Sequence, residues 1–215
     1  MKKSESDLQA WKITGPKGAV DHPNRLITLR PPPEVQAIPI EVSLLLPITD
    51  GNRTLLKAVA GLPITPYCAL GLCLVDPFLN MTTLSNRLND QGIRWVVNFP
   101  SVAQHEPAFE SYLNDVDLGL HHELDRLCRF KELGFRTLAV MCHSKDAAAI
   151  SGCNPDAVVH VPNVASFLSG VPKAMELETK ETAMRKALNA HGWTGPFLNY
   201  CVSKTSHSGS ALIRP

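Results

Sequence analysis

The chain has 215 residues, of which 44% are hydrophobic and 19% charged, a composition typical of one globular domain rather than a disordered chain. Its 21 basic and 20 acidic side chains nearly balance, so no net field would attract nucleic acid or an anionic membrane. No uninterrupted apolar stretch approaches about 18 residues, and the polar N-terminus lacks the apolar core of a signal peptide. We therefore expect a cytoplasmic protein with no nucleic-acid or membrane partner.

The first segment, residues 1–36, is polar, is interrupted by prolines and ends in three consecutive prolines at 31–33. Such a composition favours an extended chain over helices and strands. We expect an extended N-terminal arm over residues 1–36 with little regular structure. The remaining residues, 37–215, are predicted to form a β/α domain.

Six short apolar runs follow the arm and alternate with helix-like segments. The runs show little alternation of apolar and polar residues, which is typical of parallel strands covered on both faces by helices. Prolines stand at their ends, where a missing N–H costs no ladder hydrogen bond. The predicted strands are 38–46, 67–75, 95–99, 137–141, 157–161 and 197–202, and the predicted helices are 81–90, 118–133, 144–150 and 175–190.

Polar or ionisable side chains follow each of these runs. In β/α barrels and open α/β sheets, function gathers at the carboxyl ends of the strands. Capping and turn chemistry is the alternative explanation, and it suits Asp76 and Asn98 especially well. The candidate site residues chosen by this rule are Arg53, Asp76, Asn98, His143, His160, Asn163 and Asn199.

A predicted helix start at 119–123 adds His121 and Glu123 to the candidates. An acidic residue there also interacts favourably with the helix dipole, which would be a purely structural role. His121, His143 and His160 would form a metal site if they met, and otherwise they are ordinary hydrogen-bonded histidines. No fixed ligand spacing or phosphate-binding motif occurs, so the metal and the cofactor stay unassigned, with a divalent ion as one option.

Six cysteines show neither CxxC pairs nor the density of a disulfide framework. Several lie inside apolar runs, so we interpret them as buried thiols of a reducing compartment. Cys142 next to His143 is a weak candidate nucleophile, because neighbouring residues of an extended segment point to opposite sides.

Two longer stretches carry a family resemblance. Residues 71–78 read Gly-Leu-Cys-Leu-Val-Asp-Pro-Phe, and residues 92–102 read Gly-Ile-Arg-Trp-Val-Val-Asn-Phe-Pro-Ser-Val. Together with Gly-Leu-His-His-Glu at 119–123 and Asp-Ala-Val-Val-His at 156–160, they resemble the phosphoenolpyruvate hydrolase-like family of TIM-barrel proteins over about residues 40–165. The resemblance implies a barrel related to the phosphoenolpyruvate mutase and isocitrate lyase group, whose members handle small enolate-forming acids, usually with a divalent metal ion.

The sequence departs from this family pattern in several loops. The pattern's first helix-start glutamate is His121 here, whereas Glu123 matches the second, and an asparagine of the pattern falls on His143. After His160 the expected Met-Gly-Leu-Thr is replaced by Val-Pro-Asn-Val, and a glycine-rich His-Gly-Gly-Pro near the C-terminus has no counterpart at 199–204. The resemblance therefore implies the location of the site more firmly than the reaction.

The predicted fold class is α/β, a shortened or incomplete TIM barrel of about six βα units with the extended N-terminal arm. A TIM barrel typically takes about 250 residues, so this chain is expected to need something to complete its sheet. Open sheet edges must be covered, either by the arm or by a second subunit. On this ground we also expect a homodimer.

The predicted function is an enzyme of lyase or hydrolase type that acts on a small carbonyl or carboxylate compound that forms an enolate, with a specialised biosynthetic step as one option. The alternative is a non-catalytic binding or regulatory protein on a relic barrel, which the rewritten loops would equally explain. An enzyme should bring Asp76, Asn98, Glu123, His143 and His160 to one cavity, whereas a relic should scatter them. The predicted catalytic residues are His143, His160, Glu123 and Asp76, and the predicted substrate-binding residues are Asn98, His121, Asn163, Asn199 and Arg53.

Overall fold

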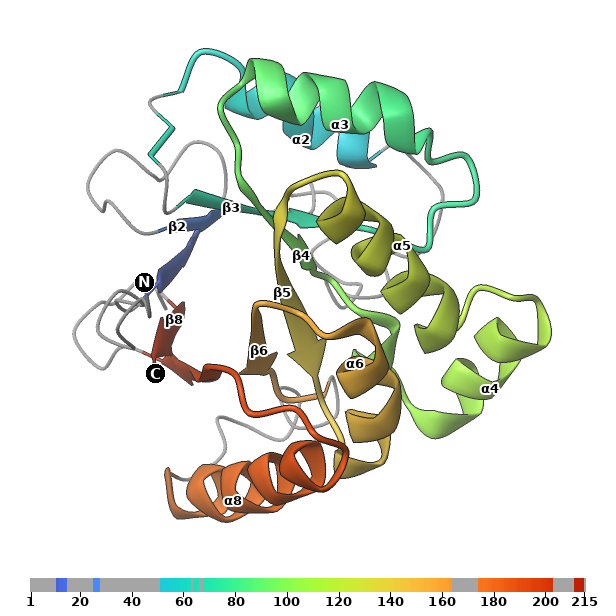
Figure 1. Ribbon diagram of the computed structural model, residues 1–215, viewed down its shortest axis with the longest axis vertical. Helices are drawn as coiled ribbons and strands as arrows, with labels where there is room; N and C mark the ends of the chain where they lie inside the picture. The colour runs from blue at the N-terminus through green and yellow to red at the C-terminus, as the bar shows by residue number, and fades with distance from the viewer. Residues whose placement is uncertain are drawn as a thin grey trace, which may run out of the picture.

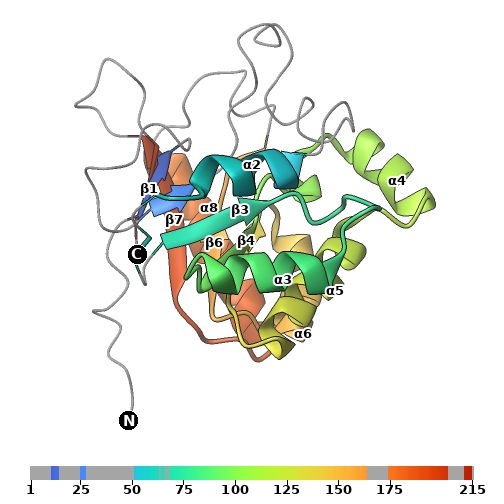
Figure 2. The same ribbon diagram turned by 90° about the horizontal axis from the view of Figure 1, so that it is seen from above.

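The computed structural model describes residues 11–14, 25–27, 51–62, 64–65, 68–163, 174–202 and 211–214. These residues form a curled sheet that is surrounded by helices (Figure 1). The view from above places the helices outside the sheet as well (Figure 2). None of the helices in the described part of the chain is long and apolar enough to cross a membrane.

The strands pair in chain order and close into a ring. Neighbouring strands from β1 to β7 are parallel, and β8 runs antiparallel between β7 and β1. The strands of the described residues are β1 (Trp11–Thr14), β2 (Arg25–Ile27), β3 (Cys68–Leu72), β4 (Trp95–Asn98), β5 (Arg136–Met141), β6 (Ala157–His160), β7 (Phe197–Val202) and β8 (Ala211–Arg214).

Helices connect most of these strands on the outside of the ring. Two short 3₁₀ turns, Val102–Gln104 and Ser144–Asp146, follow β4 and β5. Helix α4 lies furthest from the sheet in both views (Figures 1 and 2). The helices are α2 (Gly51–Val59), α3 (Met81–Asp90), α4 (Pro107–Asp115), α5 (Leu120–Glu132), α6 (Ala147–Cys153) and α8 (Ala174–Ala190).

The predicted fold class, a shortened α/β barrel, is confirmed. Every residue of β3, β4 and β6 is buried, as expected for strands covered on both faces. The amphipathic α5 turns Leu120, Leu124, Leu127 and Phe130 into the core. Each predicted helix is present within a few residues of its expected bounds.

The structure also shows what completes the short barrel. Two extended segments of the predicted arm, β1 and β2, join the sheet, and β8 bridges β7 to β1. The arm thus covers the open edge of the sheet, which is one of the two expected solutions. The predicted strand 38–46 lies outside the described residues, and helices α2 and α4 were not predicted.

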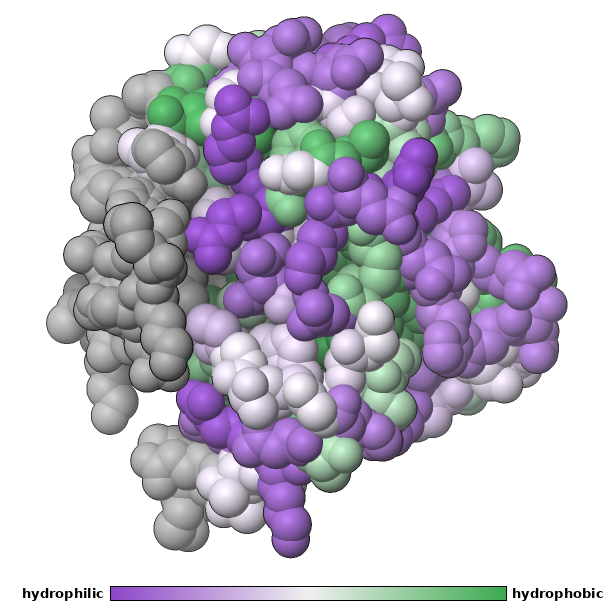
Figure 3. Space-filling view, in the orientation of Figure 1, coloured by the Kyte–Doolittle hydropathy of each residue, from purple (hydrophilic) through white to green (hydrophobic). Residues whose placement is uncertain are grey.

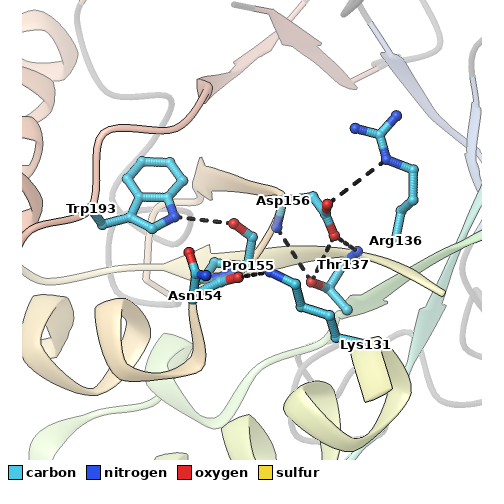
Figure 4. A network of polar contacts seen from close by, with 7 residues as sticks. All are labelled: Lys131, Arg136, Thr137, Asn154, Pro155, Asp156 and Trp193. Carbon is cyan, nitrogen blue, oxygen red and sulfur yellow. Dashed lines mark hydrogen bonds and ion pairs between the residues drawn. The ribbon is translucent and has the colours of Figure 1, made fainter. Parts of the chain in front are cut away.

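A polar network fixes the amino ends of β5 and β6 (Figure 4). The Asp156 carboxylate accepts a hydrogen bond of 2.8 Å from the backbone N–H of Thr137 and lies 4.0 Å from the Arg136 guanidinium. The Trp193 indole N–H donates to the carbonyl of Pro155 at 3.1 Å. Because each bond joins different elements, the network ties β5, β6 and the end of α8 together.

Two glycines near α5 and α6 give a matched test of the backbone. Gly134 closes α5 with φ +88°, where an L side chain is strained, whereas Gly152 lies in α6 and an added Cβ would meet no atom within 4 Å. We expect Gly134→Ala to lower the free energy of unfolding by about 1–2 kcal/mol, and Gly152→Ala to raise it by up to about 1 kcal/mol. Urea denaturation of both variants measures the difference, and equal effects would contradict it.

Candidate functional site

The predicted site residues separate into three places rather than one. His143, His160 and Asn163 line one cavity, whereas Asp76 and Arg53 line a second. Asn98 and Glu123 line neither cavity and are fully buried beside each other. The structure therefore joins the candidates in groups and does not bring Asp76, Asn98, Glu123, His143 and His160 to one cavity.

The first cavity, here called the histidine cavity, lies at the carboxyl ends of β5 and β6, beside α8. Its volume is about 200 Å³. His143 enters it from the loop after β5, and His160 is the last residue of β6. The cavity is lined by Cys142, His143, Ser144, His160, Pro162, Asn163, Lys180, Ala183 and Met184.

His160 is the most deeply placed ionisable group of this cavity. Its side chain is only 2% exposed, and its Nδ1 has no hydrogen-bond partner among the residues that the structure describes. Burial lowers the pKa of His160 to about 4, and the positive charge of Lys180 acts in the same direction. The imidazole is therefore uncharged at neutral pH and keeps a ring nitrogen available for a bound molecule.

Lys180 is a cavity residue that the sequence did not single out. It lies on α8, and its neighbour Glu181 is held by Arg185 at 2.8 Å. Among the described residues Lys180 itself forms no ion pair. The strand-end rule could not find it, because its place in the cavity depends on how α8 packs.

Glu123 forms the centre of a buried network, here called the Glu123 clamp. Its carboxylate accepts hydrogen bonds from Ser101 Oγ at 2.6 Å, from the backbone N–H of Val102 at 2.8 Å and from Asn98 Nδ2. The Asn98 Oδ1 in turn accepts the backbone N–H of Val140 at 2.8 Å. The clamp thereby joins the start of α5, the loop after β4, and β5.

These contacts leave Glu123 and Asn98 little capacity for a substrate. Both side chains are 0% exposed. Burial raises the pKa of Glu123 to about 7, against the opposing effect of the hydrogen bonds from Ser101, Val102 and Asn98. In this structure Glu123 positions loops, and its predicted direct role in catalysis has no geometric support.

The second cavity lies between α2 and α3 and has a volume of about 360 Å³. Asp76 Oδ1 accepts the backbone N–H of Phe78 at 2.9 Å. This bond is the turn chemistry that the sequence analysis gave as the alternative role of Asp76. Asn52 binds Cys73 in both directions, accepting its N–H at 3.0 Å and donating to its carbonyl at 2.9 Å. The polar groups here hold the loop after β3 in place.

The remaining candidates lie apart from these groups. His121 is exposed on the first turn of α5, so the three histidines proposed for a metal site do not meet. Within the described residues, no three His, Cys, Asp or Glu side chains are grouped as metal ligands. Asn199 pairs with His160 in the β6–β7 register, and its side chain lies outside what the structure describes.

The fold and the site together define a β/α barrel protein with a polar cavity at the carboxyl ends of its strands. The model of the family described as phosphoenolpyruvate hydrolase-like matches residues 41–195. The chain therefore belongs to the phosphoenolpyruvate hydrolase-like family. This membership confirms the resemblance found in the sequence, and it is typical of a lyase or hydrolase type of enzyme without specifying a reaction.

A curated relative matches a shorter part of the chain. The chain is 33% identical over 99 residues to the uncharacterized protein y4oT of Sinorhizobium fredii (strain NBRC 101917 / NGR234). The match covers 46% of this chain and 50% of the relative, so the chain spans about half the length of that protein.

The raised pKa of Glu123 predicts a dependence of stability on pH. The unfolded carboxyl titrates near 4.5 and the folded one near 7, so the folded state binds this proton more tightly. The resulting stabilisation is fully present below about pH 4.5 and is lost as pH rises towards 7, a change of about 3 kcal/mol. We expect Glu123→Gln to remove this part of the pH dependence in urea denaturation at pH 4.5–7.5.

Glu106→Gln is the matched control, because Glu106 is exposed and makes no capping hydrogen bond with its side chain. It should leave the pH profile of the wild type unchanged. A Glu123→Gln variant with the wild-type profile would show that Glu123 stays ionised throughout this range.

Proposed function

We propose that this protein is an enzyme of lyase or hydrolase type, that its substrate is a small carbonyl or carboxylate compound that forms an enolate, and that the histidine cavity is its active site. Family membership supports the reaction type. The observation that carries the location is the meeting of His143, His160, Asn163 and Lys180 in one cavity at the carboxyl ends of β5 and β6.

Lys180 is the proposed anchor for a substrate carboxylate. Lys180 lines the cavity, and its neighbour Glu181 is engaged by Arg185. A carboxylate placed against this charge would also be close to the buried end of the cavity at His160, since Lys180 acts on the pKa of that imidazole. The cavity volume of about 200 Å³ suits a compound with few carbon atoms.

The two histidines are the proposed groups for proton transfer. His160 is uncharged at neutral pH, so its imidazole can hydrogen-bond a substrate carbonyl oxygen without bringing a second positive charge beside Lys180. His143, which is half-buried at the cavity, is suited to take the proton next to that carbonyl, because histidine commonly serves as a general base. An enolate formed in this way would be stabilised by Lys180.

The described residues do not fit a divalent metal ion held by the chain alone. The histidine cavity offers imidazole and amide groups but no carboxylate among its described lining residues. Magnesium and similar ions prefer oxygen ligands, carboxylates above all. The proposed steps therefore use side chains of the protein.

A binding protein on a relic barrel is the second candidate. It is favoured by two observations. The five candidates expected of an enzyme do not share one cavity, and Asn98 and Glu123, which match the family pattern, are saturated by contacts within the protein. Such a protein would still hold a small acid at Lys180 but would not transform it. Binding and turnover must therefore be measured separately.

We expect pyruvate, oxaloacetate or malonate to raise the melting temperature of the protein, and Lys180→Ala to weaken that binding at least about tenfold, because a lost charged hydrogen bond costs about 1.5–3 kcal/mol. Lys186→Ala is the control, since Lys186 is exposed on the same helix and does not line the cavity. Equal binding by the two variants would remove Lys180 from the site.

We further expect His160→Ala to abolish turnover of the compound that binds, followed by NMR of the reaction mixture, while binding through Lys180 remains. Exchange of the substrate's α-protons with deuterated solvent would reveal the enolate. Saturable binding by the wild type without exchange or turnover would favour the binding protein, and full turnover by His160→Ala would exclude this residue from catalysis.

An open sheet edge no longer argues for a homodimer, because β1, β2 and β8 close the described sheet. We propose the homodimer instead from the exposed apolar side chains of the surface. On the face shown in Figure 3, polar residues cover much of the described surface and apolar residues occupy small areas between them. Exposed apolar side chains gather instead on and just after α4, where Tyr112 is 69% and Val116 62% exposed. A surface of this kind favours association.

Light scattering of the full chain tests the dimer. We expect Tyr112→Asp to convert a dimer into a monomer, because it places a charge in the proposed contact. Phe78→Asp is the control, since Phe78 is 88% exposed on the loop after β3. A monomeric wild-type protein, or equal effects of both variants, would contradict an α4 interface.

A further inference from the structure

Two cysteine thiols meet between α5 and α6. Cys153, the last residue of α6, donates a hydrogen bond to the carbonyl of Leu124 at 3.5 Å, one helical turn before Cys128 on α5. The Cys128 side chain is also close enough to Cys153 to raise the pKa of its thiol. Both cysteines are free. This pair, here called the α5–α6 dithiol, lies outside both cavities.

The two thiols differ in their access to solvent. Cys153 is 7% exposed, whereas Cys128 is only half-buried. A reagent from solution therefore reaches Cys128 before Cys153. A half-exposed thiol that contacts a buried one is the arrangement in which an adduct on the first sulfur can be displaced by the second.

The backbone around the pair is held in place by neighbouring contacts. Lys131, on the same helix as Cys128, donates to the carbonyl of Asn154, the residue after Cys153 (Figure 4). Asn154 ends α6 with φ +48°. The chain after Cys153 is thereby tied to α5, which keeps Cys153 beside the turn of α5 that leads from Leu124 to Cys128.

Charges of both signs act on Cys153. The ammonium of Lys131 lowers the pKa of its thiol, and the carboxylate of Asp125 raises it. Burial, the largest effect, raises the pKa of Cys153, followed by its contact with Cys128. Cys153 therefore stays protonated in the reduced protein and becomes the second, not the first, thiol to react.

We propose that Cys128 and Cys153 form a modification site for small disulfides, such as oxidised glutathione, which convert the pair into an intramolecular disulfide between α5 and α6. The Cys128 thiolate attacks one sulfur of the small disulfide, forming a mixed disulfide and releasing one thiol. Cys153 then loses its proton and attacks the Cys128 sulfur, releasing the second thiol. Two protein thiols are oxidised, one small disulfide is reduced to two thiols, and the balance is complete.

This modification acts on the scaffold rather than on the histidine cavity, and it does not depend on the proposed function. A cross-link from α5 to α6 encloses the chain that carries β5 and the loop with His143. Closing a loop of this length reduces the entropy of the unfolded chain. We therefore expect the oxidised protein to melt about 5 °C or more above the reduced protein.

The test treats the folded full chain with oxidised glutathione and maps its peptides by mass spectrometry without reduction. The expected product is a Cys128–Cys153 cross-link with no glutathione attached. Cys153→Ser should instead accumulate one glutathione on Cys128, and Cys128→Ser should form no cross-link. Cys73→Ser is the control, because Cys73 is also partly exposed but follows β3 and belongs to neither α5 nor α6.

The outcomes separate the proposal from its alternatives. A cross-link that appears in the wild type and in Cys73→Ser, and fails in both variants of the pair, supports it. A stable glutathione adduct on Cys128 of the wild type, a disulfide between two chains, or no reaction at Cys128 would each overturn it. Circular dichroism of Cys128→Ser and Cys153→Ser confirms that they are folded, so that a missing cross-link reflects the missing thiol.

Discussion

The carboxylate of Glu123 is the contact on which the carboxyl face of this barrel depends. A fully buried carboxylate is costly unless hydrogen bonds replace its water, and Ser101, Val102 and Asn98 supply them. Through Asn98 the same network reaches the backbone of Val140 in β5. One side chain at the start of α5 thereby fixes the loop after β4 and its distance from the neighbouring strand. Removing it would leave several buried donors without a partner at once.

Helix α5 extends this control to the loop after β3. Arg126, one turn beyond Glu123, donates to the carbonyls of Leu74 at 2.7 Å and of Asp76. From the other side of the loop, Asn52 of α2 holds Cys73. The loop after β3 is therefore shaped by bonds from helix side chains to backbone groups. Such bonds are indifferent to the side chains of the loop itself, which is free to vary where it faces a cavity.

This division explains which parts of the family pattern the chain keeps. Asn98 and Glu123, which match the pattern, belong to the clamp, and Asp76, which also matches, caps the turn after β3. His143 and Asn163, where the chain departs from the pattern, line the histidine cavity. Of the retained residues, Asp76, Asn98 and Glu123 preserve the frame, whereas His160, which is also retained, lines the cavity beside the changed residues. A residue that matches a family is therefore not for that reason a catalytic one.

The same division sets the limit of what the sequence could predict. Continuous apolar runs predicted β3 to β7, because a strand that is covered on both faces has apolar residues at successive positions. The helix α2 carries a readable stripe in Leu55, Leu56 and Val59, whereas α4 buries Glu110 alone and offers no apolar stripe. The strand-end rule found His143 and His160, but it does not predict how deeply a side chain is buried. It could not distinguish Glu123, which is sealed inside the protein.

Helix α5 also connects the two ends of the barrel. Its first turns hold the carboxyl face through Glu123 and Arg126, while Lys131 near its end binds Asn154 beside the network of Asp156. In β/α barrels the amino-terminal face serves stability and the carboxyl face serves function. Cys128 lies on this helix between the two sets of contacts, and Cys153 approaches it from the end of α6. A bond formed there would restrain the helix that positions the functional loops without adding a group to the cavity.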